Sequence, residues 1–251
     1  MTETVKVSER KLEEENKELR IVLRKLCHEM GNALTLLGGS IYYLENEIKD
    51  GKEKSVLSDV REDYRYLCAL FGNLREYNHH EGLNKAPISL STLEKNIKSA
   101  INRFNINDSI QIIYEGIEES DYINIYADVT KLQQALVNII KNSMEAMEDN
   151  AHDKGKKLCI VMSIEDDKSL GEVVHLQIKD NGKGISKSSI KEIFEPMYTY
   201  GKKQGTGLGL AVVKKIIEDH RGKIEAVSIL GTGTAIHIYL PLAGKSNIDT
   251  K

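Results

Sequence analysis

Asn138-Ile-Ile-Lys-Asn142 is the first of three short segments that decide the fold, followed by Asp180-Asn-Gly-Lys-Gly184 and Gly205-Thr-Gly-Leu-Gly209. The first lies within a long stretch of helical apolar spacing, the second directly follows an apolar strand-like run, and the third leads into another helical stretch. Glycines at such junctions allow tight turns. This order predicts a domain in which polar groups gather at the ends of helices and strands.

Around these segments, the hydrophobic periodicity predicts an α+β fold, an α/β sandwich of helices and largely antiparallel strands. The expected helices cover 90–104, 128–147 and 209–220, and the expected strands cover 110–115, 122–126, 158–163, 173–179, 223–229 and 234–241. Glycine and proline punctuate 81–87, which we interpret as a linker. The domain is expected over 87–243, with 244–251 as a tail.

The asparagine pair offers candidate metal ligands. Asn138 and Asn142 are four residues apart and share one helix face, with Lys141 and Glu145 beside them. Carboxamide oxygens are hard neutral ligands that suit Mg²⁺, which also keeps waters and phosphate oxygens. A polar helix face or a hydrogen bond within the helix explains the pair alone equally well.

The two glycine-containing segments are complementary to a nucleotide. Asp180, at the end of an apolar strand, could accept a hydrogen bond from an exocyclic amine such as that of adenine, although a plain Asn-Gly turn is the simpler alternative. Backbone N–H groups from Gly205 to Gly209 and the following helix N-terminus could meet phosphates. Each signal is weak alone, but the three in this order predict a nucleotide pocket.

The N-terminal part of the chain has a different periodicity. Over 7–48 and again to about residue 80, apolar residues recur in alternating steps of four and three, which predicts an antiparallel helical hairpin over 1–82 that turns at Asp50-Gly51-Lys52. Two copies forming a four-helix bundle would bury the apolar stripe, so we expect a homodimer. The alternative is a hairpin packed against the following domain. The residues of the stripe are Leu19, Leu23, Leu26, Met30, Ala33, Leu37, Leu44, Leu57, Val60, Tyr64, Leu67, Phe71 and Leu74.

His28 is the candidate phosphate acceptor on this hairpin. With Leu26 and Met30 as expected core positions, His28 should face outward and be exposed to solvent. A neutral imidazole can attack phosphorus through one ring nitrogen if an acceptor holds the other. Glu29 is the adjacent candidate for that acceptor, although neighbours in sequence do not share a helix face, and Asn32 lies one turn on. The simpler interpretation is a solvated surface histidine.

Composition excludes several classes of protein. The 251 residues are 40% hydrophobic, and 35 basic and 38 acidic side chains give a net charge of −3, so we expect neither a nucleic acid nor a membrane surface as a partner. Cys27, Cys68 and Cys159 form no C-x-x-C pair and are interpreted as free thiols in a reducing compartment. No apolar run approaches the ~20 residues of a membrane span. We therefore expect no membrane insertion and a cytoplasmic location.

Residues 128–241 resemble the ATP-binding domain of bacterial sensor histidine kinases, within the superfamily that includes gyrase, a heat-shock chaperone and the MutL repair protein. The match also includes Ile193-Phe194-Glu195-Pro196-Met197 and Gly231-Thr-Gly-Thr234. The resemblance implies ATP and Mg²⁺ as cofactors, with Asn138 on the metal, Asp180 on adenine, and 185–204 as a mobile lid that brings Lys202 and Lys203 to the phosphates. The nucleotide-contacting set it implies is Asn138, Lys141, Asn142, Asp180, Gly182, Gly184, Lys202, Lys203, Gly205, Thr206, Gly207, Leu208, Gly209 and Thr234.

One position separates the branches of that superfamily. The ATP-hydrolysing members carry a glutamate four residues before the second asparagine, and here that position is Asn138. A carboxamide cannot act as a general base. The pocket is therefore expected to hold ATP for transfer to another acceptor.

The segment His28-Glu29-Met-Gly-Asn32 resembles the phosphoacceptor motif H-E-x-x-N of the same family. The resemblance implies that Glu29 assists attack on the γ-phosphate and that Asn32 helps to orient water when a response regulator is dephosphorylated. Two positions depart from the family pattern: Ala33 stands where a proline is common, and Gly31 where a basic or bulky residue is common. Without the proline, less bending of the helix is expected.

We therefore predict an autophosphorylating protein histidine kinase of a two-component signalling system that passes phosphoryl from His28 to an aspartate of a response regulator receiver domain. It could also be the regulator's phosphatase. Since the first 20 residues are too short for a sensory domain, a separate sensory protein, the helix over 9–25 or a missing domain would supply the signal. The alternatives are a phosphotransfer or regulator-binding protein with weak or absent kinase activity, and a serine kinase of the anti-sigma-factor type, which lacks the hairpin.

Overall fold

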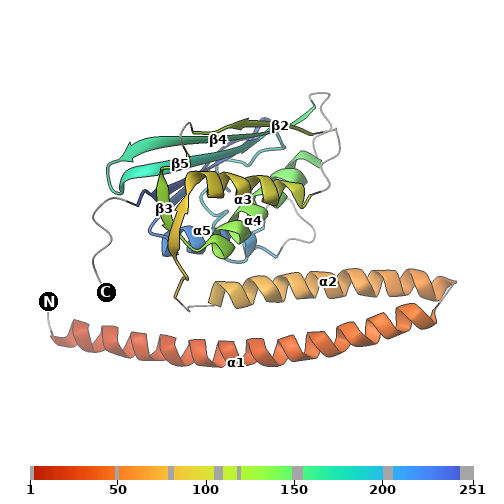
Figure 1. Ribbon diagram of the computed structural model, residues 1–251. Coiled ribbons are helices and arrows are strands. Elements are labelled where there is room, and N and C mark those ends of the chain that lie inside the picture. The colour runs from red at the N-terminus through yellow and green to blue at the C-terminus, as the bar shows by residue number, and fades with distance from the viewer. Residues whose placement is uncertain are drawn as a thin grey trace. The chain divides into compact units, whose positions relative to one another are not determined.

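The computed structural model describes residues 3–48, 51–78, 82–104, 110–117, 120–148, 155–199 and 206–243, with side chains from Val22 onward except those of Arg24 and Asn78. The chain divides into two units, Met1–His80 and Glu81–Lys251. Figure 1 shows the helical first unit and the mixed second unit. Each unit is considered by itself.

The first unit is a pair of antiparallel helices, α1 (Glu3–Glu47) and α2 (Lys52–Asn78). Gly51, with φ of 102°, lies just before α2 in a left-handed conformation that glycine adopts without steric cost. The predicted hairpin is confirmed, and its first helix begins earlier than residue 7.

The seam between the two helices differs from the predicted one. Cys27 and Ile41 are buried on α1, whereas Leu26 and Met30, which we expected in the core, are 52% and 49% exposed. A Cβ on Gly31 would lie 3.4 Å from the Phe71 ring. Glycine on α1 thus lets the Phe71 ring of α2 approach closely. The face of α1 that contacts α2 is displaced around the helix by about one residue position from the face that carries Leu26 and Met30.

The larger side chains form a second apolar stripe, which we call the open face. It consists of residues that are 42% to 52% exposed in the single chain, namely Leu26, Met30, Leu37, Leu44, Val60 and Leu67. At about 100° per residue, it lies roughly a quarter turn around α1 from the face that contacts α2. A hairpin of two helices has no element of its own to cover this stripe.

The second unit is built on a five-stranded sheet in the order β2-β4-β5-β7-β6. Its strands are β2 (Ile110–Glu115), β4 (Lys156–Asp167), β5 (Gly171–Asp180), β6 (Lys223–Ile229) and β7 (Gly233–Pro241). All neighbouring pairs are antiparallel except β2 and β4, which run parallel. The mixed sheet therefore matches the largely antiparallel arrangement that the sequence predicts.

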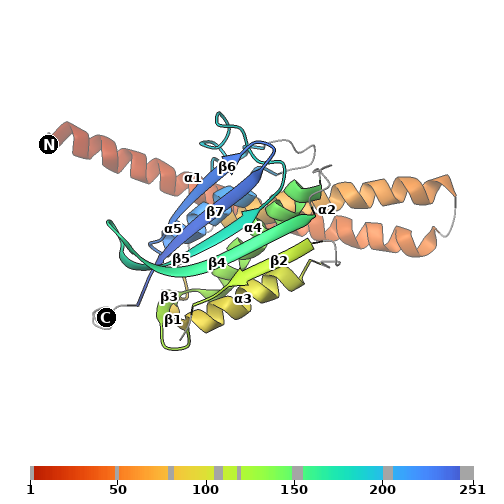
Figure 2. The same ribbon diagram turned by 90° about the horizontal axis from the view of Figure 1, so that it is seen from above.

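Three helices cover one face of this sheet: α3 (Leu90–Asn102), α4 (Val129–Glu148) and α5 (Gly209–Asp219). Figure 2 shows them beneath the strands. Their buried residues, including Leu93, Ile97, Ile139, Ile140 and Ile217, meet Leu158, Ile160, Leu176 and Ile178 of the strands in one core. The predicted α+β sandwich is confirmed.

A small second sheet was missed in the sequence. Strand β1 (Ala86–Ser89) pairs antiparallel with β3 (Asn124–Ala127). We interpreted 81–87 as linker because of Pro87, and this was wrong for Ala86 and Pro87. Proline is tolerated here because the two-stranded sheet leaves the other edge of β1 unpaired.

Candidate functional site

Helix α4 presents the asparagine pair beside the start of α5. Its buried residues Leu136, Ile139 and Ile140 face the core, which leaves Asn138 and Asn142 half-buried on an adjoining side. The Asn138 amide Nδ2 donates to the Gly209 carbonyl at 3.4 Å, so its other polar atom, Oδ1, can act as a ligand. Two of the three segments that the sequence singled out are thus in contact.

Lys141 takes a different direction from the asparagines. It is exposed and forms an ion pair with Glu145 one turn later, with 3.7 Å between Nζ and Oε1. An exposed pair of this kind contributes little to stability. Lys141 can still reach an anion by giving up this partner.

Asp180 ends strand β5 and is only 4% exposed. Its Oδ1 accepts from the Gly182 N–H at 2.9 Å and from the Thr234 N–H at 3.3 Å. Burial raises the pKa of this carboxyl, while the bonds from Gly182, Ser143 and Thr234 act in the opposite direction. The bonds from the Gly182 and Thr234 N–H groups both reach Oδ1, and a carboxylate oxygen such as Oδ2 can accept from a donor such as an exocyclic amine.

The glycines after Asp180 are required by close packing. A Cβ on Gly182 would lie 2.7 Å from the Ala146 carbonyl of α4, and the Lys183 N–H donates to the same carbonyl at 3.0 Å. Gly184 has φ of 67°, and a Cβ there would overlap the Ile229 carbonyl of β6. The turn is therefore wedged between the end of α4 and the end of β6.

The described part of the third segment, Thr206 to Gly209, leads into α5. Gly207 has φ of 66°, and its close neighbour is the backbone of Met197, itself at φ of 64°. Leu208 is buried and precedes the helix without a side-chain cap, so the first N–H groups of α5 have no side-chain partner at this cap. Lys202, Lys203 and Gly205 lie outside the described residues, as does part of the expected lid.

Thr234 is held in place from β6. Its hydroxyl lies 2.9 Å from the Ser228 Oγ, which also donates to the Gly233 carbonyl and accepts from the Ile185 N–H, each at 2.8 Å. Ser228 thereby connects β6, β7 and the segment after Gly184. Sequence analysis missed Ser228 and Ser143 because an isolated serine carries no signal of its own: strand register brings Ser228 to Thr234, and helix packing brings Ser143 to Asp180.

His28, Glu29 and Asn32 are exposed on α1, as the sequence predicts for His28. The Asn32 Nδ2 lies 3.4 Å from the His28 Nδ1. With Asn32 as donor, the neutral ring carries its proton on Nε2; turning the carboxamide over would place the proton on Nδ1 and free Nε2 for attack. Among the described contacts, His28 is bonded to Asn32 and not to Glu29.

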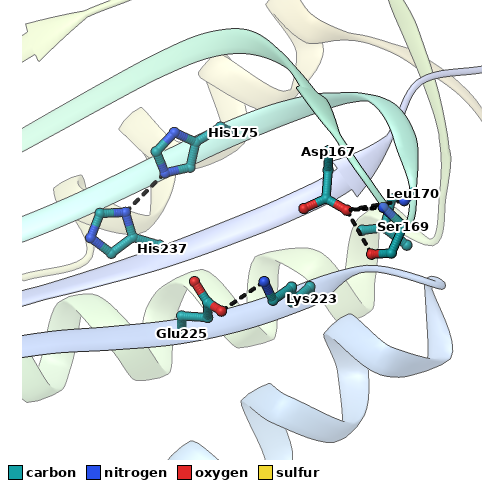
Figure 3. Close-up of polar contacts among 7 residues, drawn as sticks. All are labelled: Asp167, Ser169, Leu170, His175, Lys223, Glu225 and His237. Atoms are coloured by element: carbon teal, nitrogen blue, oxygen red, sulfur yellow. Dashed lines mark hydrogen bonds and ion pairs between the residues drawn. The ribbon is translucent and has the colours of Figure 1, made fainter.

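A separate polar cluster lies on the sheet face away from the helices, and Figure 3 shows part of it. His175 contacts the Glu165 carboxylate at 2.6 Å through Nδ1 and His237 at 3.0 Å through Nε2, and it stacks on Tyr239. Burial and the neighbouring His175 lower the pKa of His237, and the bond from His175 lowers that of Glu165. This outer-face cluster shares no described contact with Asn138 or Asp180.

The chain is similar in sequence and in fold to known kinases. Residues 127–244 match the family described as histidine kinase-, DNA gyrase B-, and HSP90-like ATPase. The chain is 32% identical over 222 residues to sporulation kinase B of Bacillus subtilis (strain 168), covering 86% of this chain and 48% of that protein. It is 29% identical over 222 residues to the signal transduction histidine-protein kinase AtoS of Escherichia coli (strain K12), covering 88% and 34%.

The second unit thus contains a domain of this ATPase family, and the chain is similar to histidine kinases over 86% or more of its length. It spans 28% to 54% of the length of four curated kinases that it matches. Its fold is similar to that of full-length ShkA crystallised with AMPPNP, with a TM-score of 0.69 at 22% identity over 88% of this chain and 45% of that one. The catalytic domain of the histidine kinase ThkA matches 63% of this chain and 96% of its own, with a TM-score of 0.51 at 26% identity.

The described residues offer neither a metal cluster nor a membrane span. No group of three or more His, Cys, Asp and Glu side chains there is arranged to hold a metal ion. No helix among these residues has an apolar stretch long enough to cross a membrane. A cation at Asn138 would therefore depend on carboxamide and phosphate oxygens.

Proposed function

We propose that this chain is an ATP-dependent protein histidine kinase of a two-component signalling system, autophosphorylated on His28. One observation supports it most. Asn138 of α4 contacts the uncapped start of α5, and in the same domain the buried Asp180 offers an acceptor. The combination provides a place for phosphates and a place for adenine in one domain.

The residues present fit Mg²⁺ and ATP. Asn138 Oδ1 would be a metal ligand, with Asn142 beside it on the same helix face, and Asp180 Oδ2 would accept from the adenine amine. Thr206 to Gly209 and, by family resemblance, Lys202, Lys203 and Gly205 would meet the phosphates. The cation would neutralise charge on the phosphate oxygens during transfer.

The transfer step needs a nucleophile that is exposed to solvent. A ring nitrogen of His28 would form a bond to the γ-phosphorus as the bond to the β-phosphate oxygen breaks and ADP leaves. Glu29 would accept the proton of the other ring nitrogen. Since Asn138 stands where a hydrolysing relative has a carboxylate base, water is poorly activated and the histidine competes well.

The phosphoryl group would then pass from His28 to an aspartate of a response regulator receiver domain, with the N–P bond breaking as an acyl phosphate forms. Asn32, whose Nδ2 lies 3.4 Å from the His28 ring, would direct water at the phosphorylated regulator and so support its dephosphorylation.

Family relatives make a dimer and a separate sensory partner reasonable, and the open face of the hairpin is the surface for the second copy. We place the two functional regions at 1–82 and 87–243, in a cytoplasmic protein.

The test is incorporation of label from γ-labelled ATP with Mg²⁺. We expect acid-labile label on the wild type and on His175→Gln, whose histidine lies in the outer-face cluster, and none on His28→Gln. Label retained by His28→Gln would rule out His28 as the acceptor. Acid-stable label would instead indicate a hydroxyl acceptor and a serine kinase.

A further inference from the structure

Asp128 connects three parts of the second unit immediately before α4. Its Oδ1 accepts from the Lys131 N–H at 3.1 Å, which caps the first turn of the helix, and its carbonyl accepts from the Leu132 N–H at 3.0 Å. Its Oδ2 accepts from the Asn84 N–H at 3.0 Å. Asp128 thus holds both the start of α4 and the segment 82–85 that enters this unit.

His220, just after α5, completes the connection. The side chain is 4% exposed, and both ring nitrogens are engaged: Nδ1–H donates to the Ile216 carbonyl at 2.7 Å and Nε2 accepts from the Asp128 N–H at 2.9 Å. A carbonyl can only accept and an amide N–H can only donate, so the tautomer is fixed. The ring is therefore neutral in this arrangement.

Helix α5 is consequently hydrogen-bonded to α4, or to the residue just before α4, at both of its own ends. At one end, Asn138 bonds to the Gly209 carbonyl where α5 begins; at the other, Asp128 bonds to His220 where α5 has ended. The segment 82–85 joins the second end, where the Lys85 Nζ also donates to the Asp219 carbonyl at 2.7 Å. The position of Asn138 relative to the start of α5 thus depends on both the Asn138–Gly209 and the Asp128–His220 hydrogen bonds.

We propose that His220 is a positioning residue, whose neutral ring keeps the start of α4 aligned with α5 and so keeps Asn138 in place for the nucleotide. Protonation of the ring would place an Nε2–H against the Asp128 N–H, two donors facing each other, and release this end of α4. Nucleotide binding would then weaken in acid. The inference rests on the proposed function, because it assigns a role to His220 through the same ATP site.

The surroundings of the ring favour the neutral form. Burial lowers the pKa of His220, and the nearby Lys85 ammonium lowers it further. The Ile216 carbonyl and the Asp128 and Asp219 carboxylates act in the opposite direction. The partner of Nε2 is the Asp128 N–H, which is a donor, and each Asp128 carboxylate oxygen already accepts one backbone bond, from Asn84 or from Lys131. An added proton on Nε2 would have to compete with these bonds.

The experiment measures binding of ATP with Mg²⁺ by calorimetry at about pH 8 and about pH 5. The acid value lies well below the usual imidazole pKa of about 6.5 because burial lowers the pKa of His220. His220→Gln keeps an acceptor for the Asp128 N–H at both pH values, and His220→Leu keeps none at either. Losing one buried hydrogen bond should weaken binding on the order of fivefold. Titration of ATP itself affects every variant equally, so only differences between variants count.

We expect the wild type to lose on the order of fivefold more affinity in acid than His220→Gln does. His220→Leu should bind weakly at both pH values. His237→Gln is the matched control: it removes a half-buried histidine of the outer-face cluster and should retain the acid loss of the wild type. An acid loss of equal size in His220→Gln, or its disappearance in His237→Gln, would overturn the proposal.

Amide hydrogen exchange separates this proposal from the proposed function and needs no nucleotide. After correction for intrinsic exchange, protection of the Asp128 amide should fall in acid in the wild type. Unchanged protection would overturn the role of His220 even if a variant fails to fold. Absence of ATP binding by the wild type at about pH 8 would instead contradict the proposed function.

Discussion

Asp180 is the residue at which stability and function can be separated. The backbone bonds from Gly182 and Thr234 both reach Oδ1, so an asparagine can keep them while presenting an amide donor in place of Oδ2. Because burial raises the pKa of Asp180, the ionised carboxylate costs folding free energy at neutral pH, and this cost disappears as the pH falls below the folded-state pKa. Removing the charge removes the same cost.

For Asp180→Asn we therefore expect thermal stability at neutral pH equal to or above that of the wild type. Nucleotide affinity should fall by roughly 10- to 100-fold, since a donor would face the adenine amine and a charge-assisted bond would be lost. Differential scanning calorimetry and nucleotide titration on the same sample test this. Lower stability together with unchanged affinity would show that Asp180 is a structural residue only.

Gly184 allows a backbone prediction at the same scale. Gly184 and Gly231 both have positive φ, at 67° and 77°, but only at Gly184 would a Cβ overlap the backbone of β6. Gly184→Ala should cost about 2 kcal/mol or more in the free energy of unfolding, and Gly231→Ala about 1 kcal/mol, since only the second is free of overlap. Urea unfolding of both variants measures the difference, and equal losses would contradict the wedged turn.

The residues that carry chemistry were predictable to different degrees. Asn138, Asp180 and the glycines stand in local patterns whose spacing is visible in the sequence. Ser143 and His220 act through Asp180 and Asp128, which are 37 and 92 residues away in sequence. Ser228 pairs with Thr234 through the register of β6 and β7. Such pairings depend on strand register and helix packing. No single-sequence pattern announces them.

At the scale of elements, the helices and main strands followed from periodicity because each has one apolar face. The hairpin shows where that reasoning ends. Periodicity located the largest aliphatic side chains, but the face of α1 that meets α2 contains Cys27, Gly31 and Ile41. Small residues such as Gly31 allow the two helices to approach closely, so the face that contains them is the one that packs against α2. The open face is then available to another partner.

Two adjacent leucines on α1 test the partner of the open face. Leu36 and Leu37 lie about 100° apart around the helix; Leu37 belongs to the open face and Leu36, at 75% exposure, points away from α2. If a second copy covers the open face, Leu37→Glu should convert a dimer to a monomer and Leu36→Glu should not. Sedimentation equilibrium measures this, and a monomeric wild type or a monomeric Leu36→Glu would contradict the arrangement.

At the scale of the whole molecule, the chain combines an exposed histidine in one unit with the proposed nucleotide site at Asn138 and Asp180 in the other. Phosphoryl transfer between them would need each unit to supply what the other lacks: His28 has no phosphate donor of its own, and the proposed site has Asn138 where a hydrolytic base would stand. Neither unit alone performs the proposed reaction. The similarity to histidine kinases extends over both units, since relatives match across 86% or more of the chain.

The most direct measurement is to locate the phosphoryl group after incubation of the protein with ATP and Mg²⁺. Digestion at neutral to alkaline pH, which preserves phosphohistidine, followed by tandem mass spectrometry identifies the modified residue. The account predicts phosphate on His28, lost after brief acid treatment. Phosphate on a serine or threonine, or an unmodified His28 in protein that binds ATP, would contradict it.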